Sequence, residues 1–79
     1  MNFGERVYRL REDSEPRLNQ TEFGRRIGLS QRKISHIEKE QTEPSLQDIK
    51  AYCEYYNLSA DYLIGLTDEP KSLREHADL

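Results

Sequence analysis

Residues Gln20–Lys39 decide the fold, and they spell QTEFGRRIGLSQRKISHIEK. Two short helical patterns occupy this stretch, and a turn of about three or four residues around Gly28 separates them. Ser30 stands directly before the second pattern as a typical helix N-cap. Gly24 lies in the first helix, where it allows the neighbouring helix to approach closely. Because so short a turn holds the second helix at a steep angle to the first, the stretch predicts a helix-turn-helix motif.

The outer face of the second helix carries polar side chains that suit contacts with base pairs. Ile34 and Ile37 are expected to face the core. Six polar residues are expected to face outward: Gln31, Arg32, Lys33, Ser35, His36 and Lys39. The major groove of DNA is about 12 Å wide and admits a helix, and in it Gln can bind adenine and Arg can bind guanine through paired hydrogen bonds. A solvated polar face is the alternative interpretation of the same residues.

The rest of the chain predicts three further helices. The first covers about residues 3–13, the fourth follows Pro44-Ser45, and the fifth covers residues 60–64. The buried stripe of the fourth helix is expected to contain Leu46, Ile49, Tyr52, Cys53 and Tyr56. The chain has four Gly, three Pro and no alternating β-branched run, so we expect an all-α fold, a compact five-helix bundle over residues 1–67. Residues 68–79 are polar and are expected to form a tail or the start of a linker.

Length and charge limit the classes of function. A chain of 79 residues and 9.4 kDa forms at most one small domain. The net charge is −3, but residues 1–39 hold nine Lys or Arg against six Asp or Glu, a net +3, while residues 40–79 hold three against nine, a net −6. The basic half suits an anionic partner such as nucleic acid, and the acidic half could hold a partner protein. No apolar run suggests a membrane span or signal peptide, so we expect a cytoplasmic protein.

Other chemistries find little support in the sequence. A single cysteine, Cys53, excludes an internal disulfide and a CxxC metal site, and its position on an apolar stripe favours a core role. His36 has no partners at metal-ligand spacing, so no metal or cofactor is expected. Asp68 and Glu69 lie in the polar tail, where no pocket could shift their pKa values, so we expect no enzyme activity. The tyrosines of the acidic half favour core or dimer contacts over stacking on bases.

The chain resembles the phage-repressor and Cro-like helix-turn-helix family, also called the XRE family, from about Val7 to Leu66. The segments that carry the resemblance are LNQ at 18–20, FG at 23–24, GLS at 28–30, ISHIE at 34–38, PSL at 44–46 and SADYL at 59–63. The resemblance implies a lambda-repressor-like five-helix domain that binds operator DNA as a symmetric dimer.

The resemblance also implies roles for the matching positions. Gln20 would grip a phosphate and brace side chains of the recognition helix, and Arg11 and Glu38 would form a structural ion pair. Gln31, Arg32 and His36 match base-contacting positions, and the loop at 41–42 matches one whose backbone amides contact phosphate. The full set of expected DNA contacts is Arg17, Gln20, Thr21, Ser30, Gln31, Arg32, Lys33, Ser35, His36, Lys39, Gln41 and Thr42.

Two loops depart from the family pattern. Glu40 stands where the family usually has glycine after the third helix, so the chain must either leave the helix differently or accept left-handed strain. The loop Glu40–Glu43 holds two acids and no base, which weakens a phosphate clamp. The loop Ser14–Arg17 is about two residues longer than usual, and we expect Arg17 to compensate in part as a phosphate contact.

Together these patterns predict sequence-specific binding of double-stranded DNA by a transcriptional regulator, with repression as the default. The alternative is an antitoxin-like module that uses the acidic half to hold another protein. One recognition helix covers too few base pairs to select a site, so we expect a homodimer on two half-sites. Apolar residues beyond the needs of the core are expected to form its surface: Tyr55, Leu58, Tyr62 and Leu66.

Overall fold

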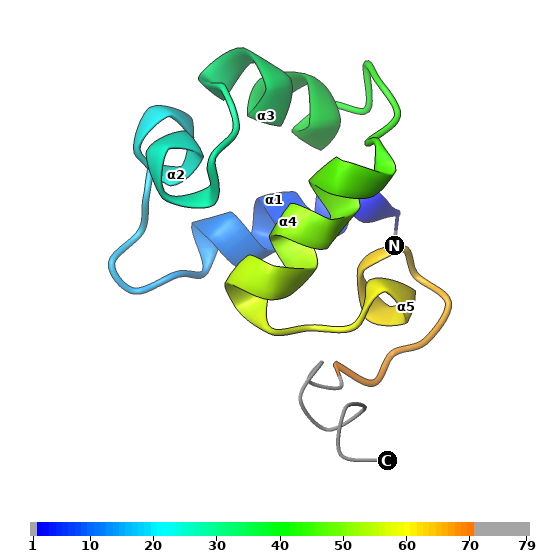
Figure 1. Ribbon diagram of the computed structural model, residues 1–79. Helices are drawn as coiled ribbons and strands as arrows, with labels where there is room; N and C mark the ends of the chain where they lie inside the picture. Colours follow the sequence, from blue (N-terminus) through cyan, green and yellow to red (C-terminus); the bar gives the residue numbers. More distant parts are fainter. Residues whose placement is uncertain (1, 71–79) are drawn as a thin grey trace.

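The computed structural model describes residues 2–70, and every regular element within them is a helix (Figure 1). In chain order the helices are α1 (Phe3–Glu12), α2 (Gln20–Ile27), α3 (Gln31–Glu38), α4 (Leu46–Tyr56) and α5 (Ala60–Leu63). The predicted all-α, five-helix fold is therefore confirmed for this part of the chain. Of the expected tail, only residues 68–70 fall within it.

Each helix begins at a side chain that caps it. Asn2, Asn19, Ser30, Ser45 and Ser59 all have extended backbones, and each side-chain oxygen accepts the backbone N–H of the residue three positions later. Capping of this kind stabilises a helix by about 1 kcal/mol. Local sequence thus sets all five helix starts.

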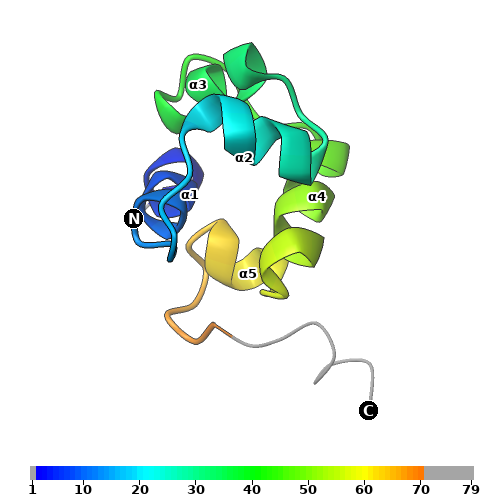
Figure 2. The same cartoon turned by 90° about the vertical axis from the view of Figure 1, so that its left-hand side faces the viewer.

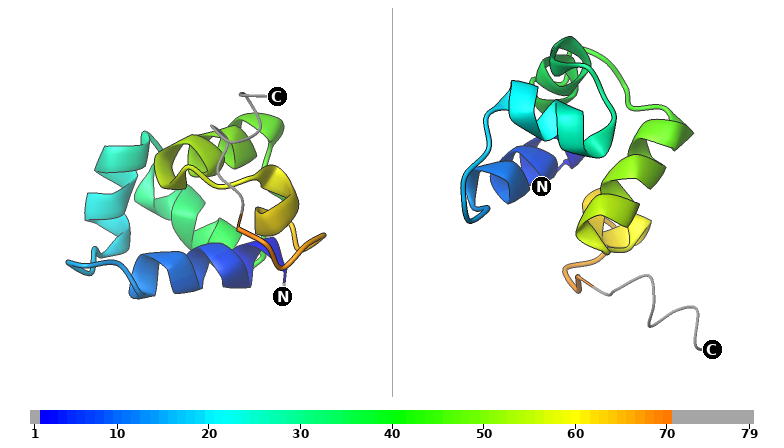
Figure 3. Two further views of the ribbon diagram at one scale, coloured as in Figure 1. Left: turned by 90° about the horizontal axis from the view of Figure 1, so that it is seen from below. Right: turned by 60° about the vertical axis from the view of Figure 1, so that its left-hand side comes forward.

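The helices surround one core (Figure 2). The largest fully buried side chain in it is Tyr52. The Phe3 ring meets the Tyr52 ring edge-on at 5.5 Å between centroids, and the Phe23 ring lies 5.8 Å away. The remaining buried apolar residues are Val7, Ile34, Ile37, Cys53 and Leu63. Every helix therefore contributes a residue to the same core cluster. Helices α2 and α3 lie at one end of the molecule, and α5 lies at the other (Figure 3).

Three expectations about apolar residues are wrong. Leu46 was expected in the buried stripe of α4, yet 85% of it is exposed. It is the first residue of α4, directly after the cap, and the core cluster does not extend to that end of the helix. Leu58 and Tyr62 were expected to exceed the needs of the core, but both pack against it. Tyr62 is held further because the Arg6 guanidinium lies 4.0 Å from the centre of its ring.

The end of α3 shows how the chain leaves this helix without a glycine. Glu40 adopts a left-handed backbone with φ of 58°. Its N–H donates to the Ile37 carbonyl at 3.1 Å, and the Gln41 N–H donates to the His36 carbonyl at 2.8 Å. This is the Schellman arrangement, in which glycine normally occupies the left-handed position. Of the two alternatives, the chain therefore accepts left-handed strain at Glu40.

We expect Glu40→Gly to stabilise the fold by about 1 kcal/mol, because a left-handed L-residue costs about 1–2 kcal/mol and glycine returns part of this gain as backbone entropy. For a domain of this size, that gain raises Tm by about 4–8 °C. Thermal melting measures it. Lys39→Gly is the matched control, because Lys39 keeps a right-handed backbone (φ −90°) and glycine there should lower Tm. A fall in Tm for both variants would show that Glu40 carries no backbone strain.

Candidate nucleic-acid interface

The turn between α2 and α3 depends on two glycines, Gly28 in the turn and Gly24 within α2. Gly28 has a φ of 85° and its N–H donates to the Gly24 carbonyl at 2.8 Å, which ends α2. A Cβ atom on Gly24 would collide with the Leu29 carbonyl oxygen and press on Ile34 at 3.3 Å. Any larger residue at position 24 would therefore push α3 away from α2. The helix-turn-helix predicted from the sequence is present, with the expected role for each glycine.

The exposed arc of α3 spans a little over half of its circumference. Successive residues of an α-helix are about 100° apart. Ile34 and Ile37 are buried, so Gln31 and Lys33 lie at the two rims of the exposed arc. The residues between these rims are Arg32, Ser35 and His36, of which Arg32 is exposed and the other two are half-buried.

A buried ion pair joins α1 to α3. The Arg11 Nε and Nη2 atoms donate to the two carboxylate oxygens of Glu38, both at 2.8 Å, and the side chains are only 6% and 3% exposed. Arg11 Nη1 also donates to the Leu18 carbonyl at 3.0 Å. The hydrogen bond to Glu38 raises the pKa of Arg11 against the opposing effect of burial, so the guanidinium stays charged. The pair fixes α3 against α1 at the loop that leads to α2.

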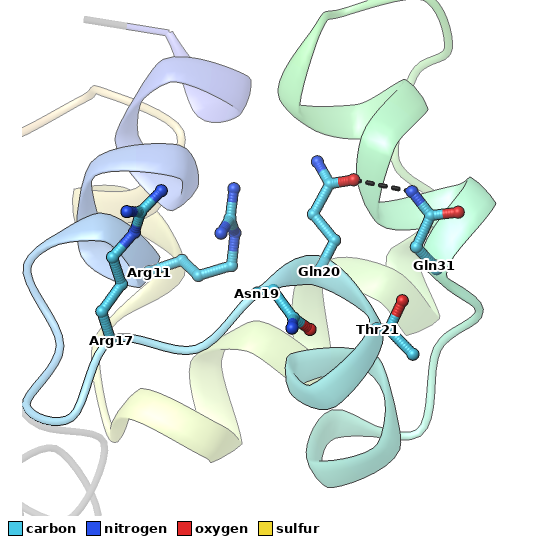
Figure 4. A pocket seen from close by; sticks show the side chains of 6 residues that line it. All are labelled: Arg11, Arg17, Asn19, Gln20, Thr21 and Gln31. Atoms are coloured by element: carbon cyan, nitrogen blue, oxygen red, sulfur yellow. Dashed lines mark hydrogen bonds between the residues drawn. The ribbon is translucent and has the colours of Figure 1, made fainter.

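Two glutamines extend this ion pair to the surface (Figure 4). Gln20 Nε2 donates to Glu38 at 3.0 Å, and Gln31 Nε2 donates to the Gln20 side-chain oxygen at 2.7 Å. Because a carboxylate only accepts hydrogen bonds, Gln20 must turn its amide nitrogen inward and its oxygen toward Gln31. Gln31 therefore keeps its own amide oxygen and one N–H free for a ligand. This pair of groups is the one that binds the edge of adenine.

An open groove of about 540 Å³ lies beside these glutamines, at the start of α2 (Figure 4). Its lining is polar and cationic and consists of Arg11, Arg17, Asn19, Gln20, Thr21 and Gln31. The free N–H groups at a helix start favour an anion. Both cations of the lining already have a carboxylate partner, Arg11 in Glu38 and Arg17 in Glu12 at 2.9 Å.

A second ion pair, which the sequence did not reveal, joins α3 to α4. The Lys33 ammonium lies 3.2 Å from Asp48 Oδ1, and Asp48 is buried. Asp48 Oδ2 also accepts the Ser45 N–H at 3.0 Å, which completes a capping box at the start of α4. Burial alone would raise the pKa of Asp48, but the hydrogen bonds from Ser45 and Lys33 outweigh it and lower that pKa.

The other expected DNA contacts occupy three places. Ser30 uses its hydroxyl to cap α3, and Thr21 lies in the groove. Lys39, Gln41 and Thr42 are exposed in and beside the loop after α3. Of the expected dimer residues, Tyr55 and Leu66 are exposed, by 39% and 74%.

The burial and spacing of the described residues bear on stacking, thiol, metal and membrane roles. Tyr52 is fully buried, and Tyr56 is half-buried and packs against the core, so neither ring is placed to stack on bases. Cys53 is buried, and burial raises the pKa of its thiol, which disfavours the nucleophilic thiolate. Within residues 2–70, no cluster of His, Cys, Asp or Glu could hold a metal ion. No helix in this part of the chain is long and apolar enough to cross a membrane.

The model of a family described as helix-turn-helix matches residues 7–63. The chain belongs to this family, in its Cro/C1 type. It is 29% identical over 63 residues to a Bacillus subtilis (strain 168) protein named uncharacterized HTH-type transcriptional regulator YobD. This match covers 80% of the chain but 56% of the relative, so the chain spans little more than half of that protein.

A solved structure shares the same architecture. The P22 c2 repressor, crystallised in complex with the synthetic operator 9T, is 31% identical and superposes with a TM-score of 0.68. The match covers 82% of this chain and 96% of the repressor chain. The helix-turn-helix protein described here therefore has the fold of a phage-repressor DNA-binding domain, as the sequence predicted.

We expect Glu38→Ala to destabilise the helix-turn-helix protein by up to about 3–5 kcal/mol, because it leaves the buried Arg11 charge with only the partly exposed Glu12 carboxylate, 3.4 Å away. Chemical denaturation measures the loss. Glu22→Ala is the matched control: its partner Arg25 is exposed, so the loss should be below about 1 kcal/mol. If Glu38→Ala removes all stability, the double variant Arg11→Met, Glu38→Leu should restore folding. Equal effects of Glu38→Ala and Glu22→Ala would contradict the role of the pair.

Asp48 should make stability depend on pH. Its folded pKa is lowered, so its contribution is present above the unfolded value of about 3.9 and is lost as the pH falls through the folded pKa. We therefore expect Asp48→Asn to lower the free energy of unfolding at pH 7 and to differ less from wild type below about pH 4. The exposed Asp61, changed to Asn, serves as the control and should show little difference at either pH. A gap between wild type and Asp48→Asn that stays constant across this range would be inconsistent with the lowered pKa.

Proposed function

We propose that this helix-turn-helix protein regulates transcription by binding double-stranded DNA at specific sequences, with α3 in the major groove. The observation that carries the proposal is the hydrogen-bonded series from Arg11 and Glu38 through Gln20 to Gln31. It fixes the amide of Gln31 at the surface before any ligand binds, which reduces the entropy lost on binding. Membership of the family and the similarity to a repressor solved with its operator support the same function over an antitoxin-like role.

Base contacts come from the exposed arc of α3. Gln31 offers an oxygen and an N–H to adenine, and Arg32 can donate two hydrogen bonds to guanine. His36 lies one turn after Arg32 on the same line and contacts the next base pairs along the groove. Ser35 lies between these side chains and Gln31.

Phosphate contacts come from the two sides of α3. The groove at the start of α2 supplies Thr21, Arg17 and the free backbone N–H groups of the helix start, among them that of Gln20. On the other side Lys39, Gln41 and Thr42 are exposed near the end of α3. Such contacts fix the register of the protein on the duplex without carrying sequence information themselves. The net +3 of residues 1–39 attracts the duplex, and the net −6 of residues 40–79 disfavours binding by the opposite end.

A repressor is the simplest regulator that this arrangement supports, because a domain that occupies a promoter needs no further activity to block it. Binding to operator DNA would place the protein in the cytoplasm. We propose a homodimer, with the surface near the end of α5, at the opposite end from α2 and α3 (Figure 3). Leu66 and Ile64 are exposed there, by 74% and 41%. A two-fold dimer through this end presents two recognition helices to half-sites about 34–36 Å apart.

Selection of bound sites from random duplexes tests this function, and we expect an enriched, two-fold symmetric site. Arg32→Ala should then weaken binding to that site by about 1–3 kcal/mol and relax the preference at one base pair in each half. Arg26→Ala is the control, because Arg26 is exposed on α2 away from the α3 surface and should leave the preference unchanged. The absence of any enriched sequence would contradict the proposed function.

Leu66→Ser should reveal the dimer surface. It should reduce affinity for a duplex with two half-sites much more than for one with a single half-site, because only the first depends on contact between protomers. Titration of both duplexes measures the difference. Leu46→Ser removes a leucine that is also exposed but lies at the start of α4, and it should affect both duplexes equally. Equal losses for Leu66→Ser would exclude this surface.

A further inference from the structure

Lys33 differs from Arg32 and Lys39, the other Lys and Arg residues of α3 and its C-cap, because it already has an acidic partner. Its ammonium lies 3.2 Å from Asp48 Oδ1, although the lysine side chain itself is 45% exposed. Arg32 and Lys39, by contrast, form no ion pair among residues 2–70. Lys33 stands at the rim of the exposed arc that faces α4, while Gln31 stands at the opposite rim against α2.

Asp48 cannot follow Lys33 outward. The Asp48 side chain is only 4% exposed. Its carboxylate accepts a hydrogen bond from the Ser45 N–H, and the Asp48 backbone N–H donates to the Ser45 hydroxyl at 3.1 Å. If Lys33 moved to a phosphate, this buried carboxylate would lose the cation that balances it. Leaving a buried charge unpaired is strongly unfavourable. The geometry therefore favours Lys33 on Asp48 over Lys33 on DNA.

We propose that Asp48 holds Lys33 off the phosphate backbone and is thereby a specificity-determining residue of this DNA-binding surface. The inference rests on the proposed function. Binding to arbitrary sequences comes almost wholly from cations on phosphates, whereas the preferred site adds base contacts. Withholding one cation weakens binding to all sequences and leaves the base contacts of Arg32 and His36 to decide among them. Lys33 was expected from the sequence to contact DNA, and this pairing gives it a different role.

The test is the dependence of affinity on salt, measured with a random-sequence duplex. Each phosphate contact contributes about 0.9 to the slope of log K against log salt concentration. We expect Lys33→Gln to keep the wild-type slope, and Lys39→Gln, the control with a free lysine, to lower it by about one. Asp48→Asn should steepen the slope by about one, because it releases Lys33 while the Asn oxygen can still cap Ser45. The double variant Lys33→Gln, Asp48→Asn should return to the wild-type slope.

The same variants should change selectivity. Asp48→Asn should bind the random duplex several-fold more tightly and lower the ratio of affinities for the selected site and the random duplex. Lys33→Arg preserves the pair and should match wild type in slope and ratio. Thermal melting of each variant checks that it is folded. Lys33→Gln leaves the buried Asp48 carboxylate without its cation, so Asp48→Asn gives the answer if Lys33→Gln does not fold, and Lys33→Gln gives it if Asp48→Asn does not.

Two results would overturn the inference in a chain that binds DNA. One is a slope that falls in Lys33→Gln as far as in Lys39→Gln, and the other is an unchanged slope in folded Asp48→Asn. Failure of the wild-type chain to bind any duplex would instead overturn the proposed function, and this inference with it.

Discussion

The DNA-binding surface depends on the buried ion pair between Arg11 and Glu38. The guanidinium forms two hydrogen bonds of 2.8 Å to the carboxylate, in a place that water hardly reaches. A buried pair adds little net stability, because desolvation of both charges offsets their attraction, but it strongly penalises any arrangement that separates them. Its effect is therefore geometric: α1 and α3 have one favourable relative position.

The same carboxylate also controls the chemistry at the surface. Glu38 turns the Gln20 amide, and Gln20 in turn leaves Gln31 with a defined acceptor and donor. On the other rim of α3, a second buried carboxylate, Asp48, holds Lys33 toward α4. Two acidic residues inside the protein thus arrange a surface that we propose contacts a polyanion. Glu38 orients Gln20, and Asp48 holds Lys33. Neither carboxylate lines the groove at the start of α2.

The sequence predicted the features that depend on neighbouring residues. Cap residues such as Ser30, and Gly28 with its left-handed backbone, are local signals, so the helix starts and the turn were predictable. The predictions of burial were wrong where contacts between helices far apart in the sequence determine which side chains are covered. Leu46 fits the periodicity of α4, yet the core does not extend to it, and Tyr62 is covered because Arg6 from α1 lies on its ring. Sequence spacing carried no sign of the contact between Lys33 and Asp48, because it joins different helices.

We infer that Gln20 positions Gln31 for base recognition. A double-mutant cycle with Gln20→Ala and Gln31→Ala tests it most directly, with discrimination between the selected site and its single-base variants as the measured quantity. We expect both single variants to lose discrimination at the same base pair. The double variant should lose little more than Gln31→Ala alone, because coupled residues are non-additive. Losses at different base pairs, or losses that simply add, would show that Gln20 and Gln31 act independently and would contradict the account.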